Sequence, residues 1–384
     1  MTDAPGPSRT QVLELETSET ESQRFDYRIL RARAAGVDGK AIEAALFKHE
    51  PDILILRIPS ESLWQVPRLD RTGFPYIVAD TLLYYRVDLT RHEPRPLRNE
   101  TLEFHECRSE DAPALGKLVR EIFPGYTNHY FSNPYLDRGR LLDAFEDWAV
   151  RYIAGKDRTA WLARLDGTPV AFATCSLRGS ESEGVLYGVS PAVSGRGIYG
   201  DLIRFTQMHH KTHGAKQMTV STQPQNYAVQ TVWNREGFML VKSVTTVHIN
   251  SMLAKSVVEK RELDFRVSAD EIGACGRFSG DMNPLHFDDT FAQGIGFEGR
   301  IAHGLVGSSA ISKYYGTEFP GPGTLFLGSS CKFSKPVYPG RNYRLLFSFP
   351  YIDRGRGIYR ALAKLTDDRG AACLLCYSDL YRKP

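Results

Sequence analysis

The octapeptide Ser279–His286 constrains the fold of this chain more than any other segment, because it predicts a helix start flanked by a carboxylate and an imidazole. Asn283 is a favourable N-cap residue and Pro284 suits the first helical position. We therefore expect Asp281 on the approach loop and His286 in the first turn. Such a corner can aim both side chains at one point, as general acid–base catalysis requires, and histidine titrates near neutral pH without strong perturbation.

A second motif lies downstream of this corner. The run Ile301–Gly304 reads IAHG and is followed by small and apolar residues as far as Ser312. On these two motifs, the stretch from about Phe265 to the C-terminus resembles the MaoC-like (R)-specific enoyl-CoA hydratases, whose hallmark is SGD-x-NPLH-x-D followed by IAHG. The resemblance implies a hot-dog fold in which Asp281 and His286 activate a water molecule.

The same resemblance assigns three further positions. The backbone N–H of Gly304 would bind the thioester oxygen, Ser312 would form a hydrogen bond near the catalytic pair, and Asn283 would support the loop. The chemistry is consistent, because adding water to an α,β-unsaturated thioester builds enolate charge on the carbonyl oxygen, which N–H groups at a helix start stabilise. The alternatives are that Asp281 only caps a turn and His286 is a surface histidine, or that the domain binds thioesters without turnover.

The composition is that of a globular protein with more than one domain. The 384 residues suffice for two or three domains, and the hydrophobic fraction of 42% and the charged fraction of 24% are typical. The net charge of +3 is too small to indicate nucleic acid or a membrane surface as a partner. No apolar run approaches the roughly 18 residues of a spanning helix, and no signal segment opens the chain, so we expect a cytoplasmic protein.

Neither the cysteines nor the histidines indicate a metal site. Cys373 and Cys376 form a C-x-x-C sequence, but they lie in an apolar run that is typical of a buried strand, where positions three apart face opposite sides. Core packing is therefore favoured over a redox or metal role. The histidines show no metal-ligand spacing, and we expect no metal cofactor.

A glycine-rich turn marks a second candidate site. The segment Val189–Gly200 lies between a predicted strand and a predicted helix, where successive backbone N–H groups can cradle a pyrophosphate. Residues 100 to 249 show the order β-α-α-β-β-β-α-β-α-β, an α+β arrangement and not a doubly wound sheet. With Asn226–Phe238, this stretch resembles the GNAT acyltransferase superfamily, in which the turn grips the pyrophosphate of coenzyme A. The resemblance implies these cofactor-binding residues: Val189, Gly195, Arg196, Gly197, Ile198, Tyr199, Gly200 and Asn226.

Three positions depart from the superfamily pattern. Ser194 stands where Arg or Gln is usual, and Tyr199 where Gly or Ala is usual. Trp233 occupies the position at which many members have a tyrosine that protonates the leaving thiolate. The acid of this reaction is therefore open, and Tyr227 or a water molecule could take the role.

The acceptor side has a more moderate resemblance. The segment Ile77–Leu82, together with Thr222–Asn226, is similar to the branch of the superfamily that acylates nucleotide-linked amino sugars. That comparison implies a dTDP-linked amino sugar as acceptor. His129 and Tyr130 are the candidates for contact with the acceptor, with His129 as a possible base, although a packing cluster within the loop is at least as consistent with the sequence.

These inferences predict an α+β protein with a GNAT fold, an extra amino-terminal lobe and a hot-dog domain. The boundaries that follow are a disordered tail at 1–22, the lobe at 23–99, the acyltransferase at 100–250, a linker at 251–261 and the hydratase at 262–384. We expect at least a homodimer, paired through segments near Leu325–Phe333 and Tyr359–Leu365, because a long exposed edge strand is otherwise a liability.

The fusion itself predicts a sequence of two reactions. Hydration of an enoyl-CoA such as crotonyl-CoA would give an (R)-3-hydroxyacyl-CoA, and transfer of that acyl group to the amine of a nucleotide-linked amino sugar would serve surface polysaccharide synthesis. Two alternatives remain open: an acetyl-CoA-dependent N-acetyltransferase joined to an independent hydratase, or one joined to a hot-dog module that only binds thioesters or dimerises.

Overall fold

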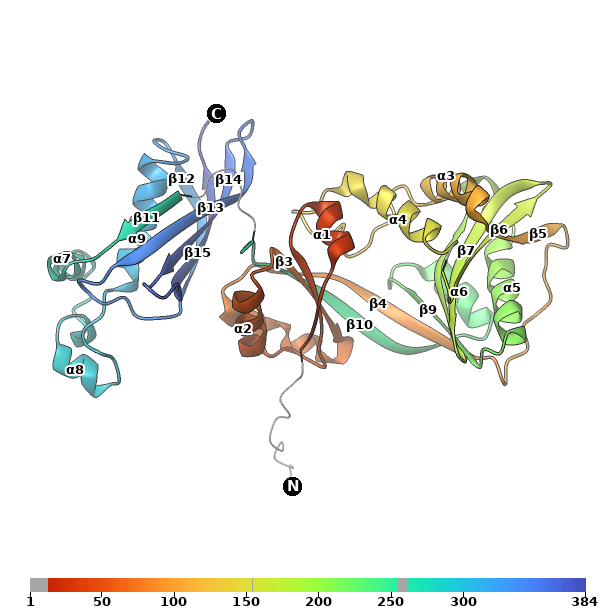
Figure 1. The fold of residues 1–384 in the computed structure, drawn as a ribbon, viewed down its shortest axis with the longest axis horizontal. Coiled ribbons are helices and arrows are strands. Elements are labelled where there is room, and N and C mark those ends of the chain that lie inside the picture. The colour runs from red at the N-terminus through yellow and green to blue at the C-terminus, as the bar shows by residue number, and fades with distance from the viewer. Residues whose placement is uncertain (1–12, 154, 255–260) are drawn as a thin grey trace, which may run out of the picture. The chain divides into compact units, whose positions relative to one another are not determined.

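The computed structural model describes residues 13–153, 155–254 and 261–384. They form two compact units, which are treated separately below (Figure 1). Unit 1 comprises the described part of residues 1–37, together with 54–66 and 76–249. Unit 2 comprises 38–53, 67–75 and the described part of 250–384. Most of the linker expected at 251–261 lies outside the described residues.

Unit 1 is built on a ten-stranded sheet with the order β1-β2-β3-β10-β4-β9-β8-β7-β6-β5. Its strands are β1 Glu14–Thr17, β2 Ile29–Arg33, β3 Ile53–Pro59, β4 Tyr76–Asp88, β5 Leu102–Glu106, β6 Arg158–Leu165, β7 Thr168–Arg178, β8 Glu181–Val189, β9 Gln217–Thr222 and β10 Met239–Asn250. The strands β8 and β9 pair in parallel, and only from Glu181 opposite Gln217 to Gly184 opposite Val220. Beyond these residues the pairing ends, which leaves backbone groups of both strands available to a ligand.

Helices cover both faces of the β5–β9 part of this sheet (Figure 1). Alternate residues of each strand point to opposite faces, so Leu162 and Phe172 pack with Leu115 of α3, whereas Trp161 packs with Leu202 of α5. The helices are α1 Glu19–Phe25, α3 Ala112–Ile122, α4 Leu141–Val150, α5 Ile198–Thr212 and α6 Tyr227–Arg235, with 3-10 turns at Ser60–Thr72, Ser109–Asp111, Arg138–Arg140 and Pro191–Val193.

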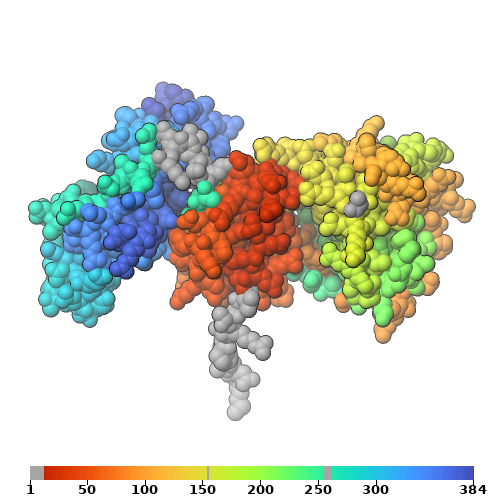
Figure 2. Space-filling view, viewed as in Figure 1, coloured from red at the N-terminus to blue at the C-terminus, as the bar shows by residue number. Residues whose placement is uncertain are grey.

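The start of the chain differs from the prediction of disorder at 1–22. Residues 1–12 lie outside the described residues, but β1 and α1 occupy most of the remainder, and the red N-terminal part of the chain joins a continuous packed surface (Figure 2). Contacts with residues distant in sequence explain this order. Glu21 is buried and accepts a hydrogen bond from Arg31, and Phe25 is buried against the ring of Tyr130. Neither partner is adjacent in sequence, so composition alone predicts a solvated tail.

Unit 2 contains a five-stranded antiparallel sheet with the order β11-β13-β14-β15-β12. One face of the sheet packs on α9, where Tyr314 stacks on Phe347 and Tyr315 is fully buried. This sheet around a central helix is the hot-dog arrangement, and the predicted α+β class is confirmed. The elements are β11 Arg261–Phe265, β12 Leu325–Phe333, β13 Tyr343–Asp353, β14 Ile358–Thr366, β15 Ala372–Tyr381, α2 Gly39–His49, α7 Ala269–Ser279, α8 Asp289–Gly294 and α9 Gly304–Thr317, with a 3-10 turn at Pro284–His286.

One of the two segments expected to pair with a second chain lies inside the sheet. The segment Tyr359–Leu365 lies in β14, which is hydrogen-bonded on both sides by β13 and β15 and therefore cannot pair with another chain. Of the two segments expected to pair, β12 alone is an edge strand. Cys373 and Cys376 are buried in β15, as expected. Across the described residues, no helix is both long enough and apolar enough to cross a membrane.

Candidate active sites

The corner predicted around Asp281 is built by two helix ends. The helix α7 starts at a capping box, in which Ser268 and Glu271 bond each other's backbone N–H groups, and stops at Gly280. Gly280 has φ 77°, a left-handed conformation that glycine adopts without steric cost. The chain then turns, and the side chain of Asn283 accepts a hydrogen bond from Leu285 N at 3.1 Å. Asn283 therefore supports the loop and starts the turn that carries His286.

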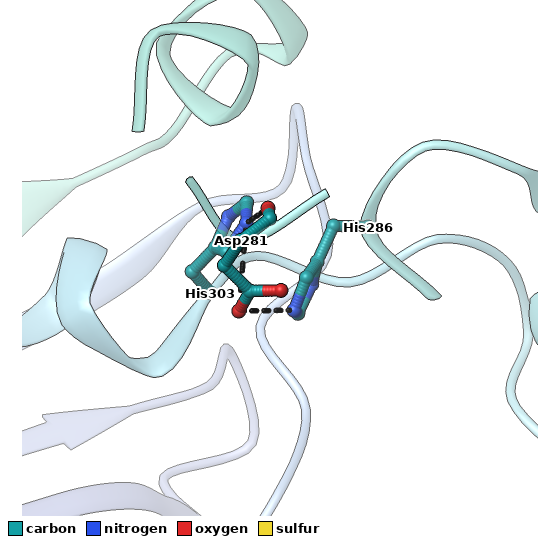
Figure 3. A group of neighbouring side chains, drawn as sticks. All are labelled: Asp281, His286 and His303. Atoms are coloured by element: carbon teal, nitrogen blue, oxygen red, sulfur yellow. Dashed lines mark hydrogen bonds and ion pairs between the residues drawn. The ribbon is translucent and has the colours of Figure 1, made fainter. Parts of the chain in front are cut away.

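Three side chains meet at this corner (Figure 3). The Asp281 Oδ2 atom lies 3.7 Å from His286 Nε2 and 4.0 Å from His303 Nε2. The two imidazole rings are stacked, with centroids 3.7 Å apart and an interplanar angle of 28°. Both imidazoles are buried, whereas the side chain of Asp281 is 51% exposed. A polar group on a substrate can therefore reach the carboxylate.

Two backbone carbonyls fix the orientation of the rings. His286 Nδ1 lies 2.8 Å from the carbonyl oxygen of Ile301, so this nitrogen carries a proton and donates it to that bond. In the neutral ring Nε2 then offers a lone pair on the side of Asp281. His303 Nε2 donates to the carbonyl oxygen of Asp281 at 2.9 Å.

A metal ion is disfavoured by the same hydrogen bonds. Asp281, His286 and His303 are close enough in space to be considered as a ligand set. However, His303 Nε2 carries the proton that it donates to Asp281, and a protonated nitrogen cannot bind a metal. The arrangement favours a water molecule held between a carboxylate and an imidazole.

An adjacent cavity of about 550 Å³ can hold an acyl chain. His286, His303 and Gly304 line it, and the remaining lining is largely apolar, including Leu305 and Phe333. Gly304 is the first residue of the 14-residue helix α9, so its N–H has no partner within the helix. A Cβ atom at this position would come within 2.9 Å of the Phe333 ring, which explains why glycine is needed here.

The structure leaves Ser312 outside the cavity lining and adds His303 to the corner. Ser312 is exposed and lies eight residues along α9 from Gly304, or about 12 Å at 1.5 Å per residue. Its hydrogen bond near Asp281 and His286 stays a prediction. His303, which the sequence presents only as part of the IAHG motif, contacts both of these residues. A histidine that directly precedes a helix start is the signal that could have identified it.

The glycine-rich turn of unit 1 has the geometry of an anion-binding loop. Gly195 and Gly197 have φ values of 79° and 83°, and α5 begins directly after them. Exposed backbone N–H groups at such a helix start favour a phosphate. The loop is braced from outside: the buried carboxylate of Asp201 accepts hydrogen bonds from the backbone N–H groups of Arg98 and Asn99 at 2.7 and 3.0 Å. Sequence reasoning did not identify Asp201.

Asn99 also contacts the glycine-rich turn, because its Nδ2 atom donates a hydrogen bond to the Arg196 carbonyl oxygen at 3.2 Å. The other expected cofactor residues lie near the ends of elements. Val189 is the last residue of β8, and Ile198 and Gly200 are buried in the first turn of α5. Asn226 lies at the N-cap position of α6, and its amide donates to Thr222 Oγ1 at 3.1 Å.

The two unusual aromatic residues are packing groups. Burial raises the pKa of Tyr199, and Trp233 is buried against the ring of Tyr85. Tyr227, the alternative acid, is 75% exposed at the first position of α6. Tyr227 and a water molecule therefore remain the two candidates for the acid that protonates the leaving thiolate.

A cavity of about 360 Å³ lies beside the unpaired ends of β8 and β9, and His129 and Tyr130 both line it. The hydroxyl of Tyr130 is held by the Glu21 carboxylate, which Arg31 bonds at 2.6 and 2.8 Å. This contact gives Tyr130 a structural role in the wall.

The proton on His129 can be located from its neighbours. Asn133 Oδ1 accepts from Tyr135 N at 3.1 Å, so the Asn133 amide nitrogen donates to His248 Nδ1 at 3.0 Å. His248 Nε2 then donates to His129 Nδ1 at 2.9 Å, which leaves the proton of the neutral His129 ring on Nε2. Burial also lowers the pKa of His129 well below its usual value. In this tautomer Nδ1 is occupied by His248 and Nε2 is protonated, which disfavours His129 as a base.

Comparison with known proteins identifies domains in both halves of the chain. Residues 254–352 match the family model described as MaoC like domain. Residues 118–238 match the model described as Acetyltransferase (GNAT) family. The chain thus contains a MaoC-like domain and a GNAT domain, each from a family of enzymes.

Curated relatives match the MaoC-like part. The (R)-specific enoyl-CoA hydratase of Aeromonas caviae is 40% identical over 84 residues, which are 22% of this chain and 63% of that protein. The mitochondrial 3-hydroxyacyl-[acyl-carrier-protein] dehydratase of Arabidopsis thaliana is 34% identical over 111 residues, 29% of this chain and 64% of that protein. The chain therefore spans less than two thirds of the length of either relative.

Solved structures resemble each part as well. The (R)-hydratase from A. caviae involved in PHA biosynthesis is 28% identical, with 34% of this chain and 98% of that chain covered and a TM-score of 0.32. A GCN5-related N-acetyltransferase from Kribbella flavida is 19% identical, with 57% and 81% covered and a TM-score of 0.39.

Proposed function

We propose that this chain is a bifunctional enzyme that hydrates an enoyl-CoA in unit 2 and transfers the resulting acyl group to an amine in unit 1. The observation that carries the first activity is the separation of 3.7 Å between Asp281 Oδ2 and His286 Nε2, beside a cavity that is lined by Gly304, the first residue of α9. Relatives named as (R)-specific enoyl-CoA hydratases support the (R) configuration of the product.

The hydration mechanism follows from these groups. A water molecule between the carboxylate and the imidazole loses a proton to one of them as its oxygen bonds to C3 of the enoyl thioester. The π electrons move toward the thioester oxygen, where the Gly304 N–H stabilises the developing negative charge. A proton returned to C2 completes the 3-hydroxyacyl thioester, so no proton is gained or lost overall.

Replacing one carboxylate oxygen tests this assignment. Asp281→Asn should lower kcat for hydration of crotonyl-CoA by at least 100-fold, because the amide cannot accept the water proton. Asp270→Asn is the matched control, since Asp270 is an exposed residue in the first turn of α7 in the same unit. The loss of absorbance of the conjugated thioester measures the rate. If the wild type and Asp281→Asn hydrate crotonyl-CoA at the same rate, Asp281 is not the catalytic carboxylate, and if neither hydrates it, unit 2 is a binding or dimerising module.

The second activity is transfer of the acyl group to a nucleotide-linked amino sugar, as part of surface polysaccharide synthesis. The GNAT match, the glycine-rich turn and the adjacent cavity support acyl transfer, and the acceptor class rests on the resemblance of the segments Ile77–Leu82 and Thr222–Asn226. Coenzyme A thioesters are the substrates of both reactions.

The coupling of the two reactions has its own test. Wild-type protein incubated with crotonyl-CoA and a dTDP-linked 4-amino-4,6-dideoxy sugar should yield a 3-hydroxybutanoyl amide, detected by mass spectrometry. The Asp281→Asn variant should yield that amide only when 3-hydroxybutyryl-CoA is supplied. If the wild type forms only a crotonyl amide, the reactions are not coupled. If acetyl-CoA outcompetes 3-hydroxybutyryl-CoA, the chain is an N-acetyltransferase joined to a separate hydratase.

A further inference from the structure

The cavity of unit 1 extends from the amino-terminal strands β3 and β4 to the gap between β8 and β9, where a thioester would lie. Arg57 on β3 and Asp80 on β4 line one part of it, and Val185 and Ser221 line another. The last two residues directly follow the final paired positions of β8 and β9. A ligand in this cavity therefore reaches the gap between the two strands.

Most charges around the cavity are already paired within the wall. Glu21 is bonded by Arg31 and Tyr130. Arg24 contacts Asp147 at 3.4 Å, and the Arg151 guanidinium donates to Thr20 at 3.4 Å. These contacts hold the three groups in the wall, which Glu183 also lines.

Two charged groups of the wall each keep one buried atom without a hydrogen-bond partner. Within the described part of the chain, these atoms are Asp80 Oδ1 and Arg57 Nε. The other carboxylate oxygen of Asp80 has a long contact of 3.5 Å from Gln223 Nε2. Burial raises the pKa of Asp80 against the lowering effects of Thr246, Gln223, the positive charge of Arg57 and the His129 backbone.

Such atoms carry a cost that a ligand can remove. A buried polar atom without a partner has lost its hydrogen bonds to water, and the cost is larger when the group is charged. A carboxylate is satisfied by an ammonium group, and a guanidinium by a phosphate or carboxylate. Asp80 and Arg57 therefore have opposite preferences, and His129 lines the same cavity.

We propose that this cavity binds a primary amine that itself carries a phosphate group, with the ammonium at Asp80 and the phosphate at Arg57. This inference rests on the proposed acyl transfer and defines the class of its acceptor. The phosphate is either a sugar phosphate monoester or the diphosphate of a nucleotide sugar.

Asp80 also acquires a catalytic role in this arrangement. An ammonium group must lose a proton before it can attack, and Asp80 accepts that proton. The free amine then forms the N–C bond with the thioester carbonyl as the C–S bond breaks. A second proton leaves the nitrogen and the departing thiolate takes up one proton, so one amide, one thiol and one released proton result.

Matched amines test the proposal on the full-length protein. D-Glucosamine, D-glucosamine 6-phosphate and a dTDP-linked amino sugar are each offered with acetyl-CoA and with 3-hydroxybutyryl-CoA. Calorimetry measures binding, and mass spectrometry measures amide formation. At least one phosphate-bearing amine should be acylated with a kcat/KM at least tenfold above that of glucosamine. The better of the two distinguishes a monoester from a diphosphate.

Two variants separate the roles of the two groups. Arg57→Met should reduce the preference for the phosphorylated amine over glucosamine from at least tenfold to about onefold. Asp80→Asn should lower kcat for all amines by at least 100-fold while acyl-CoA still binds. The matched controls are Arg369→Met and Asp368→Asn, exposed positions in the turn after β14.

The outcomes distinguish the inferred acceptor class from the proposed acyl transfer. Acylation of glucosamine and its phosphate at equal rates, or a preference that survives Arg57→Met, overturns the inference and leaves acyl transfer intact. Failure of both phosphate-bearing amines to bind also overturns it. If acyl-CoA binds but no amine in the panel is acylated, the proposed acyl transfer is wrong as well.

Discussion

At the scale of single residues, the hydratase site depends on a histidine that need not exchange a proton with substrate. His303 donates to the Asp281 carbonyl and stacks on the His286 ring, so it fixes the separation of the two catalytic groups. Its Nδ1 atom is buried and has no partner among the described residues. The contacts of His303 on this side are therefore those of its Nε2 atom and its ring face, with Asp281 and His286 respectively.

Replacement of this positioning residue should affect kcat and not substrate binding. We expect His303→Asn to lower kcat for crotonyl-CoA hydration by about 10- to 100-fold, because small misplacements of reacting groups have effects of that size. KM and the melting temperature should change little. Steady-state kinetics and thermal denaturation measure these quantities. A tenfold rise in KM at unchanged kcat would mean that His303 contacts the substrate directly.

Buried histidines of unit 1 should make its stability depend on pH. Burial lowers the pKa of His210 and of His248 to about 4 from the usual 6.5. Below pH 6.5 the unfolded chain takes up protons that the folded chain excludes, so the free energy of unfolding falls between pH 6.5 and 4. Each unit of pKa shift corresponds to about 1.4 kcal/mol at full effect.

The variant His210→Met isolates one of these groups, since both ring nitrogens of His210 are buried without partners in the described structure. The drop in melting temperature between pH 7.5 and 4.5 should be smaller for His210→Met than for the wild type. An equal drop in both proteins would show that His210 does not titrate in this range.

At the scale of elements, Asp201 connects the glycine-rich turn to the segment before β5. Its carboxylate is fully buried and accepts from the backbone of Arg98 and Asn99 and from Arg204 at 3.1 Å. We expect Asp201→Asn to reduce the free energy of unfolding by about 3 kcal/mol, because it disrupts a buried charged network. Acetyl-CoA affinity should fall as the turn loosens.

Urea denaturation and calorimetric titration with acetyl-CoA measure these two effects. Asp143→Asn is a suitable control, because Asp143 pairs with Arg120 at an exposed position, and such pairs contribute about 0–1 kcal/mol. Equal stability losses in both variants would contradict a special role for Asp201.

Local sequence signals predicted the elements that local chemistry determines. The turns at Asn283 and Gly197 follow from backbone preferences, so the turn that carries His286 and the helix α5 lie where the sequence predicts them. The failures depend on distant partners. The helix α1 is stabilised by Arg31 and Tyr130, and the role of Asp201 arises from its contacts with Arg98 and Asn99.

At the scale of the whole molecule, β12 is the element that most clearly requires a partner. It is an edge strand, and Leu325, Phe326 and Leu327 on it are exposed. Its far end is engaged within unit 2, where Lys332 pairs with Glu43 of α2. An exposed apolar edge promotes association between chains.

We therefore expect a homodimer in which β12 pairs with β12 of a second copy. Leu327, which is 63% exposed, is the position where a charge should be most disruptive. Leu327→Lys should give a monomer in analytical ultracentrifugation at micromolar concentration, because two buried like charges oppose pairing at the shared edge. Leu263→Lys is the matched control, since Leu263 is an exposed leucine on β11 at the opposite edge. A dimer disrupted only by Leu263→Lys would place the interface elsewhere, and a monomeric wild type would contradict the homodimer. Since the cavity beside His303 is also lined by Phe333 at the end of β12, loss of the dimer should lower hydratase activity more than acyl transfer.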